Sequence, residues 1–266
     1  APSRPPTECL AVPADRLELE WVHGVRSHDI RGQLSYCPDS GDIIFPAGNV
    51  VVSMNSHERS QRFLNEHGGE VVSVCVHQSQ SLAASGDLCA SPTVVVWDYV
   101  TLQPLRVLKG HHKRAVFLLA FSHDEDAKFL VSIGSDDAHT AVIFDWRNDC
   151  VVARMPTQKS KPLDLLFARP GRGFGAGDCG FILCGDGFVH YWNFNGASAN
   201  ATTQSVRLGV GKHRKPQPFL CLAWLEENNL VIGALDGSLI RLSGRHLDKI
   251  VSRAHAGAIN SAVSTE

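Results

Sequence analysis

The chain has 266 residues, of which 44% are hydrophobic and 20% are charged, and its formal net charge at pH 7 is −2. This is the composition of a globular domain with a large core. The near-neutral charge argues against general nucleic-acid binding. Neither an apolar run long enough to span a bilayer nor a signal-peptide pattern is visible, so we expect no nucleic-acid partner and no membrane partner.

The N-terminal part contains an arm followed by an apolar segment. Residues 1–15 are rich in Pro and Ala and are interpreted as an arm or linker. The stretch LELEWV, which begins at Leu17, alternates apolar and charged residues and so predicts a β-strand. One face of a lone strand cannot stay dry, so this segment must dock through its large apolar side chains. We assign residues 16–63 to this segment and a first small sheet.

The rest of the chain repeats one pattern of elements. Short apolar runs alternate with turn clusters, without helical periodicity. The same order of four runs fills residues 64–108, 109–156, 157–210 and 211–252, and residues 253–266 begin another set. Aromatic landmarks recur at the period of a four-stranded propeller blade, as Trp97-Asp98, Asp145-Trp146 and Tyr191-Trp192.

Repetition at this spacing predicts the architecture. A four-stranded sheet cannot bury both faces alone, so successive sheets must stack around an axis. The prediction is an all-β propeller of four-stranded blades, because an immunoglobulin-like sandwich would not repeat a four-run order. We count about five blades plus the start of another. An open edge is an aggregation liability, so we expect the native protein to continue beyond this chain. A closed five-blade ring would contradict that expectation.

Several dipeptides resemble those of the WD-repeat family. They are Gly110-His111 before one repeat, Trp97-Asp98 as the WD dipeptide, and Asp145-Trp146 as its variant. In that family a His, a Ser or Thr, a turn Asp and a Trp form a buried hydrogen-bonded network. The resemblance implies one such network, made of His111, Ser132, Asp137 and Trp146. The other blades are degenerate, and the resemblance assigns no complete network to them, although His67, His111 and His255 lie at repeat-equivalent turns and are interpreted as structural histidines.

The opening segment carries a more specific resemblance. Its features are Leu17, Leu19, Trp21 and Val22, then Gly24, Arg26, Asp29 and Arg31, a strand ending in AGNVVV, and QRFLNEH from Gln61. They are similar to the hydrophobic HELP motif of the echinoderm microtubule-associated protein-like (EMAP-like) family, and the resemblance runs from about residue 17 to the last residue. It implies that Leu17, Leu19, Trp21 and Val22 are structural anchors packed into the core of a tandem propeller unit. An ordinary first strand of a first blade is the alternative.

The resemblance also implies a function. It predicts a non-enzymatic microtubule-associated protein in the cytoplasm and cytoskeleton, on microtubules, spindle, centriole or ciliary axoneme. Its partners would be tubulin or microtubules, with other cytoskeletal or axonemal proteins possible. The alternative is a WD-repeat scaffold for signalling or ciliary and centriolar assembly proteins. A propeller enzyme is the remote alternative, and an axial channel lined only by small, apolar or backbone groups would eliminate it.

Site chemistry of other kinds has little support in the sequence. The glycine-rich stretch 171–180 leads into a strand rather than a helix, so it does not match a nucleotide-binding loop. Cys179 and Cys184 lack a second ligand pair of zinc-site spacing and are interpreted as reduced core thiols, which fit a cytosolic setting. No nucleophile–base set is recognisable. We expect no cofactor, no metal and no catalytic residue.

Basic residues collect in the connectors that begin successive blades. Radial repetition brings these connectors to one face, where we predict partner binding by Lys109, Lys113, Arg114, Lys159, Lys161, Lys212, Arg214 and Lys215. Acidic clusters at 124–126 and 226–227 fall in the other connector type, on the opposite face. Exposed loops also collect charge by default, and four acidic residues share the basic side: Asp136, Asp137, Asp186 and Asp236.

Overall fold

The structure is a computed structural model that describes residues 17–26, 30–37, 39–169, 179–194, 203–210, 217–225 and 229–263. Within these ranges the chain forms twenty β-strands and no helix. The strands build five four-stranded antiparallel sheets, each from strands consecutive in sequence. No helix in the described part of the chain has the length and hydropathy of a membrane span.

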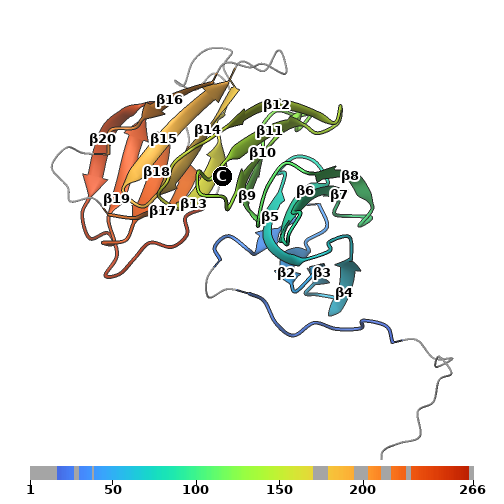
Figure 1. Ribbon diagram of the computed structural model, residues 1–266. Helices are drawn as coiled ribbons and strands as arrows, with labels where there is room; N and C mark the ends of the chain where they lie inside the picture. The colour runs from blue at the N-terminus through green and yellow to red at the C-terminus, as the bar shows by residue number, and fades with distance from the viewer. Residues whose placement is uncertain are drawn as a thin grey trace, which may run out of the picture.

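The five sheets follow one another around an arc (Figure 1). The first contains β1 (Ser35–Tyr36), β2 (Ile43–Ala47), β3 (Val50–Asn55) and β4 (Ser60–Leu64). The second contains β5 (Glu70–Val76), β6 (Leu82–Leu88), β7 (Thr93–Asp98) and β8 (Pro104–Lys109). The third contains β9 (Val116–Phe121), β10 (Phe129–Gly134), β11 (Ala141–Asp145) and β12 (Cys150–Met155).

The last two sheets complete the arc. The fourth contains β13 (Pro162–Phe167), β14 (Cys179–Gly185), β15 (Phe188–Phe194) and β16 (Thr203–Arg207). The fifth contains β17 (Phe219–Trp224), β18 (Asn229–Ala234), β19 (Leu239–Ser243) and β20 (His246–Val251). The ring does not close, as the sequence predicts for an incomplete propeller.

The core lies in layers between neighbouring sheets. The strands are rich in β-branched and aromatic residues, and strands with both faces covered, such as β6, β10 and β17, are buried along almost their whole length. Trp97 and Tyr99 fill the layer between the first and second sheets, and Phe144 and Trp146 that between the second and third. Two further layers join the third sheet to the fourth and the fourth to the fifth. The stacking predicted from the repeats is therefore the source of the core.

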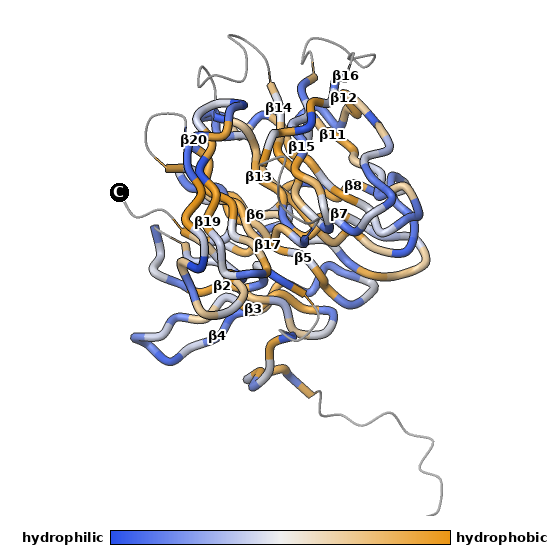
Figure 2. Tube along the Cα trace, turned by 90° about the vertical axis from the view of Figure 1, so that its left-hand side faces the viewer, coloured by the Kyte–Doolittle hydropathy of each residue, from blue (hydrophilic) through white to orange (hydrophobic). Residues whose placement is uncertain are grey.

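The prediction of a strand at the start of the opening motif is wrong. Residues 17–26 form no strand, and the side chains of Leu17 and Leu19 are 104% and 51% exposed. Trp21 is 37% exposed and lies 6.1 Å from His23, ring to ring. Figure 2 shows hydrophobic residues of this segment outside the first sheet. The alternation is present in sequence, but no neighbouring strand edge in the described chain receives it.

Val22 is the anchor that does pack. It contacts an apolar cluster on the outer face of the first sheet, formed around Phe45, Val50 and Val52. Its backbone is held by Gln61: the Val22 N–H donates to Gln61 Oε1 at 2.8 Å, and Gln61 Nε2 donates to the Val22 carbonyl at 3.0 Å. One side chain of β4 thus replaces the strand edge that the segment lacks.

Candidate interaction face and central channel

The two ends of the sheets form two different faces. We call the connector face the end that carries the links between successive sheets and the turns between the second and third strands of each sheet. The other end is the turn face. Backbone hydrogen bonds join links to turns on the connector face: Cys89 N–H donates to the Arg114 carbonyl at 3.0 Å, and Thr157 N–H to the Ala138 carbonyl at 3.0 Å.

The predicted basic residues that the structure describes lie on the connector face. Lys109 ends β8, Lys113 and Arg114 lie in the link to β9, and Lys159 and Lys161 lie in the link between β12 and β13. The remaining three lie outside the described residues, namely Lys212, Arg214 and Lys215. The acidic run 124–126 lies in the turn between β9 and β10, on the turn face. Residues 226–227 lie outside the described residues.

Acidic groups on the connector face reduce part of its positive charge. Arg114 Nη1 lies 2.8 Å from Asp137 Oδ1, with side chains 65% and 89% exposed. An ion pair this exposed is worth about 0–1 kcal/mol, so it leaves Arg114 open to another acidic partner. Asp136 is used internally, because it accepts hydrogen bonds from Thr140 Oγ1 and from the Ala138 N–H, both at 3.0 Å.

A complete histidine network lies in the second sheet, where the sequence predicts a structural histidine at His67 but not the whole network. His67 Nε2 lies 2.7 Å from Ser85 Oγ, and its Nδ1 lies 3.3 Å from Asp87 Oδ2. Asp87 also accepts from the Thr93 N–H at 2.7 Å. Burial alone would raise the pKa of Asp87, but the hydrogen bonds from His67 and Thr93 hold it below its ordinary value. The network ties the link before β5 to the β6–β7 turn.

In the third sheet the predicted network is displaced by one residue at two positions, and it is incomplete, because His112 Nδ1 has no hydrogen-bond partner among the described residues. His112, not His111, contacts Ser132, with 2.6 Å between Nε2 and Oγ. Asp136, not Asp137, organises the β10–β11 turn. His111 instead places its ring edge on Phe144, with centroids 4.9 Å apart. The sequence GHHK offers two adjacent histidines, and the link's conformation decides which one turns inwards.

The tryptophans of the predicted motif do not join these networks. Trp146 donates through Nε1 to the Ala127 carbonyl at 2.6 Å, and Trp97 is fully buried between the first two sheets. Asp98 accepts from the Val100 and Thr101 N–H groups at 2.9 and 2.8 Å and from Ser81 Oγ at 2.9 Å. The WD dipeptide here therefore contributes a packing group and a turn-forming carboxylate.

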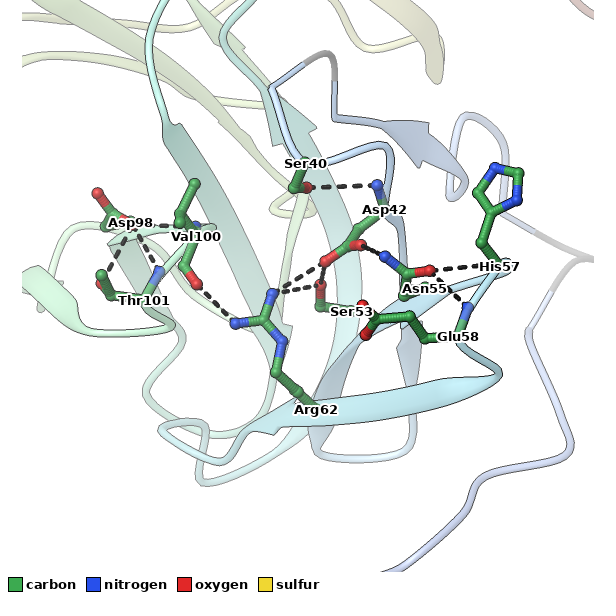
Figure 3. A network of polar contacts seen from close by, with 10 residues as sticks. All are labelled: Ser40, Asp42, Ser53, Asn55, His57, Glu58, Arg62, Asp98, Val100 and Thr101. Carbon is green, nitrogen blue, oxygen red and sulfur yellow. Dashed lines mark hydrogen bonds and ion pairs between the residues drawn. The ribbon is translucent and has the colours of Figure 1, made fainter.

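The first sheet has a polar network of its own (Figure 3). Asp42 Oδ2 accepts from Ser53 Oγ and Arg62 Nη2, both at 2.9 Å, and Asp42 Oδ1 accepts from Asn55 Nδ2 at 2.9 Å. Arg62 also donates through Nη1 to the Val100 carbonyl at 2.6 Å. Because Val100 follows β7, this network links the first sheet to the second.

Two further residues of the opening motif can be placed. Arg26 forms an ion pair with Glu70 at 2.6 Å, so it joins the opening segment to the start of β5. Gly24 is exposed, and a Cβ there would meet no atom within 4 Å. Nothing in the described packing requires glycine at that position.

The central channel contains charged groups. A cavity of about 130 Å³ is lined by the inner strands of the sheets and includes Arg31, Asp164, Cys221 and Asn260. Asp164 accepts from the Leu222 N–H at 2.7 Å and the Leu165 N–H at 2.8 Å, and its burial raises the pKa to about 6. Arg31 Nη1 donates to Asn260 Oδ1 at 2.8 Å. The channel is thus not lined only by small, apolar or backbone groups, so the condition that would eliminate an enzyme is not met.

The candidate metal and thiol residues form no cluster in the described chain. No group of three or more His, Cys, Asp or Glu there could hold a metal ion. The seven described cysteines are free, and three of them are buried: Cys37, Cys184 and Cys221. Burial raises the pKa of Cys221 to about 11, so this thiol stays protonated at neutral pH.

Two solved structures resemble the fold. The structure titled U3-55K matches with a TM-score of 0.62 and 18% identity, covering 86% of this chain and 67% of that one. The RRP9 WD40 repeats match with a TM-score of 0.61 and 19% identity, covering 86% and 66%. At these identities the matches show the fold alone, a WD-repeat propeller.

Sequence relatives are more specific. Echinoderm microtubule-associated protein-like 4 of Xenopus tropicalis is 29% identical over 251 residues, which are 91% of this chain and 26% of the relative. Echinoderm microtubule-associated protein-like 2 of Mus musculus is 28% identical over 260 residues, 93% of this chain and 38% of the relative. The chain therefore spans well under half the length of these relatives.

Two family models match the chain and confirm the resemblance predicted from the sequence. The HELP motif model matches residues 12–52. The model described as the echinoderm microtubule-associated protein first beta-propeller matches residues 60–266, most of the chain. The chain belongs to this echinoderm microtubule-associated protein propeller family.

Proposed function

We propose that the chain is a non-enzymatic, microtubule-associated module that binds tubulin or microtubules through its propeller. The observation that carries the proposal is the connector face: on a chain of this family, five of the predicted basic residues lie together there. The acidic run 124–126 lies on the turn face. In this proposal the cations of the connector face attract an acidic partner despite the net charge of −2.

Binding of this kind requires several weak contacts to act together. Each exposed ion pair contributes about 0–1 kcal/mol, so a single lysine would not hold a partner. At physiological ionic strength the interaction reaches about 8 Å, which restricts the strongest contribution to residues at the contact. The proposal therefore includes Lys212, Arg214 and Lys215, which share the sequence pattern but lie outside the described residues.

Co-sedimentation with microtubules tests the proposal. We expect the chain to pellet at low salt and to be released as salt rises. Changing Lys113, Arg114 and Lys215 to Glu should weaken pelleting at least about tenfold, because it reverses three charges of the face. A matched control reverses three charges away from that face, at Lys128, Arg147 and Lys249. Undiminished pelleting of the first variant would contradict binding through the connector face.

The proposed location is the cytoplasm and cytoskeleton, on microtubules. The rival proposal is a WD-repeat scaffold for signalling or for ciliary and centriolar assembly proteins. A scaffold of that kind would stay in the supernatant when microtubules are pelleted. That outcome with the unmodified chain would favour the rival over the microtubule proposal.

A further inference from the structure

The mouth of the central channel on the connector face holds a second, larger cavity of about 350 Å³. Its walls come from the opening segment, the second and third sheets, and the link into the fourth. It shares Arg31, Phe117, Leu118 and Leu163 with the smaller cavity, so the two cavities adjoin. A cavity of this size holds a few side chains of a ligand.

The rim of this cavity carries cations. Arg26, Arg31 and Lys161 line it beside His139, whose Nδ1 lies 2.7 Å from the Gln158 carbonyl oxygen, and the described lining contains no Asp or Glu. Arg26 is paired with Glu70, whereas Lys161 has no ion pair with a described residue. A guanidinium has five N–H donors, and the described hydrogen bonds of the Arg31 side chain use one of them, on Asn260. Arg31 and Lys161 are therefore able to bind carboxylates.

The wall between these cations is apolar. It includes Val72, Phe117, Leu118 and Leu163. An apolar wall beside two cations fits a ligand that carries carboxylates on either side of an apolar side chain. Further in, the partly exposed Asp164 carboxyl group lines the smaller cavity and accepts a hydrogen bond from the Leu222 N–H at 2.7 Å. A second carboxylate placed there would lie beside this one, so we expect the acidic groups of a ligand to stay at the rim.

We propose that the channel mouth is a binding site for an acidic peptide segment with an apolar residue between its carboxylates. The carboxylates contact Arg31 and Lys161, and the apolar side chain packs on Phe117, Leu118 and Leu163. The inference deepens the proposed function: the connector face attracts an acidic partner, and the channel mouth holds one short stretch of it in a defined position.

Three synthetic peptides with a neutral fluorophore test the site by fluorescence anisotropy on the full chain. The probe is Glu-Glu-Leu-Glu-Glu, and the controls are Gln-Gln-Leu-Gln-Gln and Glu-Glu-Gly-Glu-Glu. We expect each control to bind about tenfold more weakly than the probe, because one lacks the charges and the other lacks the apolar group. Equal binding of the probe and the glycine control would reduce the site to unspecific charge attraction and overturn the proposal.

Matched variants locate the binding. Lys161→Glu reverses a rim charge and should weaken the probe at least about tenfold, whereas Lys128→Glu, on the turn face and outside the cavity lining, should change it less than about threefold. Leu163→Trp fills the cavity without changing charge and should also weaken the probe about tenfold. Thermal unfolding of each variant checks that it is folded. Equal effects of the two lysine variants, or unchanged binding to folded Leu163→Trp, would place the peptide elsewhere and overturn the proposal.

The two proposals fail separately. If microtubule pelleting depends on the connector-face charges but the probe does not bind, the channel site is wrong and the proposed function stands. If the probe binds as expected while the chain does not pellet with microtubules, the channel site stands and the microtubule partner is wrong.

Discussion

His67 is a buried ring whose two nitrogens lie next to Ser85 and Asp87. Replacing it with Ala leaves a buried carboxylate and hydroxyl without this partner, which typically costs about 2–4 kcal/mol of the free energy of unfolding. His111→Ala removes a half-buried ring whose side chain makes no hydrogen bond with a described residue, and it should cost less than about 1 kcal/mol. Urea unfolding of both variants measures the difference. Similar losses would show that the His67 network is not a major source of stability.

The buried ring of His112 makes stability depend on pH. Burial, with a contribution from the Arg154 guanidinium, lowers its pKa from 6.5 to about 4. The unfolded chain therefore binds a proton that the folded chain does not, and the free energy of unfolding falls as pH drops from about 6.5 towards 4. Protonation linked to this ring alone should lower the free energy of unfolding by about 2 kcal/mol between pH 7 and pH 5.

Gln does not titrate, so His112→Gln should lose about 2 kcal/mol less of its free energy of unfolding than the parent chain between pH 7 and pH 5, as measured by urea unfolding. The comparison must be between the variant and the parent chain, because Asp164 acts in the opposite direction. Its pKa is raised from 3.8 to about 6, so it lowers stability as pH rises through that window. Parallel pH profiles of variant and parent would contradict a buried neutral ring at position 112.

At the residue scale the sequence predicts types of group better than positions. It indicates a His–Ser–Asp network in the third sheet but selects His111 and Asp137, one residue away from His112 and Asp136. The link before β9 contains Arg114 at φ 70°, a local conformation that a residue pattern does not encode. In the second sheet the link has a single histidine, His67, so the sequence leaves no choice of ring, and the structure adds its contacts to Ser85 and Asp87.

At the scale of the elements, the opening segment shows where alternation of apolar and polar residues fails to predict a strand. The sequence predicts the strands of the repeated sheets because each pairs with at least one neighbouring strand, so alternation and β-branched runs coincide with burial. Residues 17–26 have the alternation but no neighbouring strand. Their conformation depends on what lies beside them, and in the described chain this is Val22 on the first sheet.

Gln61 should control the order of that segment. Gln61→Ala removes both hydrogen bonds to the Val22 backbone, and we expect the Val22 amide to exchange with deuterium at least about tenfold faster. The amide of Val51, inside the first sheet, is the internal control and should keep its protection. The loss of global stability should be small, about 1 kcal/mol, because the segment contributes one apolar side chain to the cluster. Unchanged exchange at Val22 would mean that packing alone holds the segment.

As a whole molecule, the chain is an open arc in which the two end sheets have one neighbour each. The inner strands pack in sequence order, β5 on β9, β9 on β13 and β13 on β17. The end sheets leave large apolar side chains exposed: Leu34 and Tyr36 beside the first, and Leu247 and Val251 on the last. A stacked array is stabilised by its sheets and by the layers between them, so the ends should be its weakest part.

We therefore expect the arc to open from its ends. In native-state hydrogen exchange at low denaturant, the amides of β3 and β18 should exchange before those of β10, which lies in the middle sheet with core layers on both faces. The free energy of opening should be about 1–3 kcal/mol lower for β3 and β18 than for β10. This is roughly what one layer between two sheets contributes once the entropy lost in ordering the chain is subtracted. The Arg31–Asn260 hydrogen bond crosses the axis between the two ends but is exposed, so it should not equalise them. Simultaneous exchange of all three strands would instead show that the five sheets unfold as one cooperative unit.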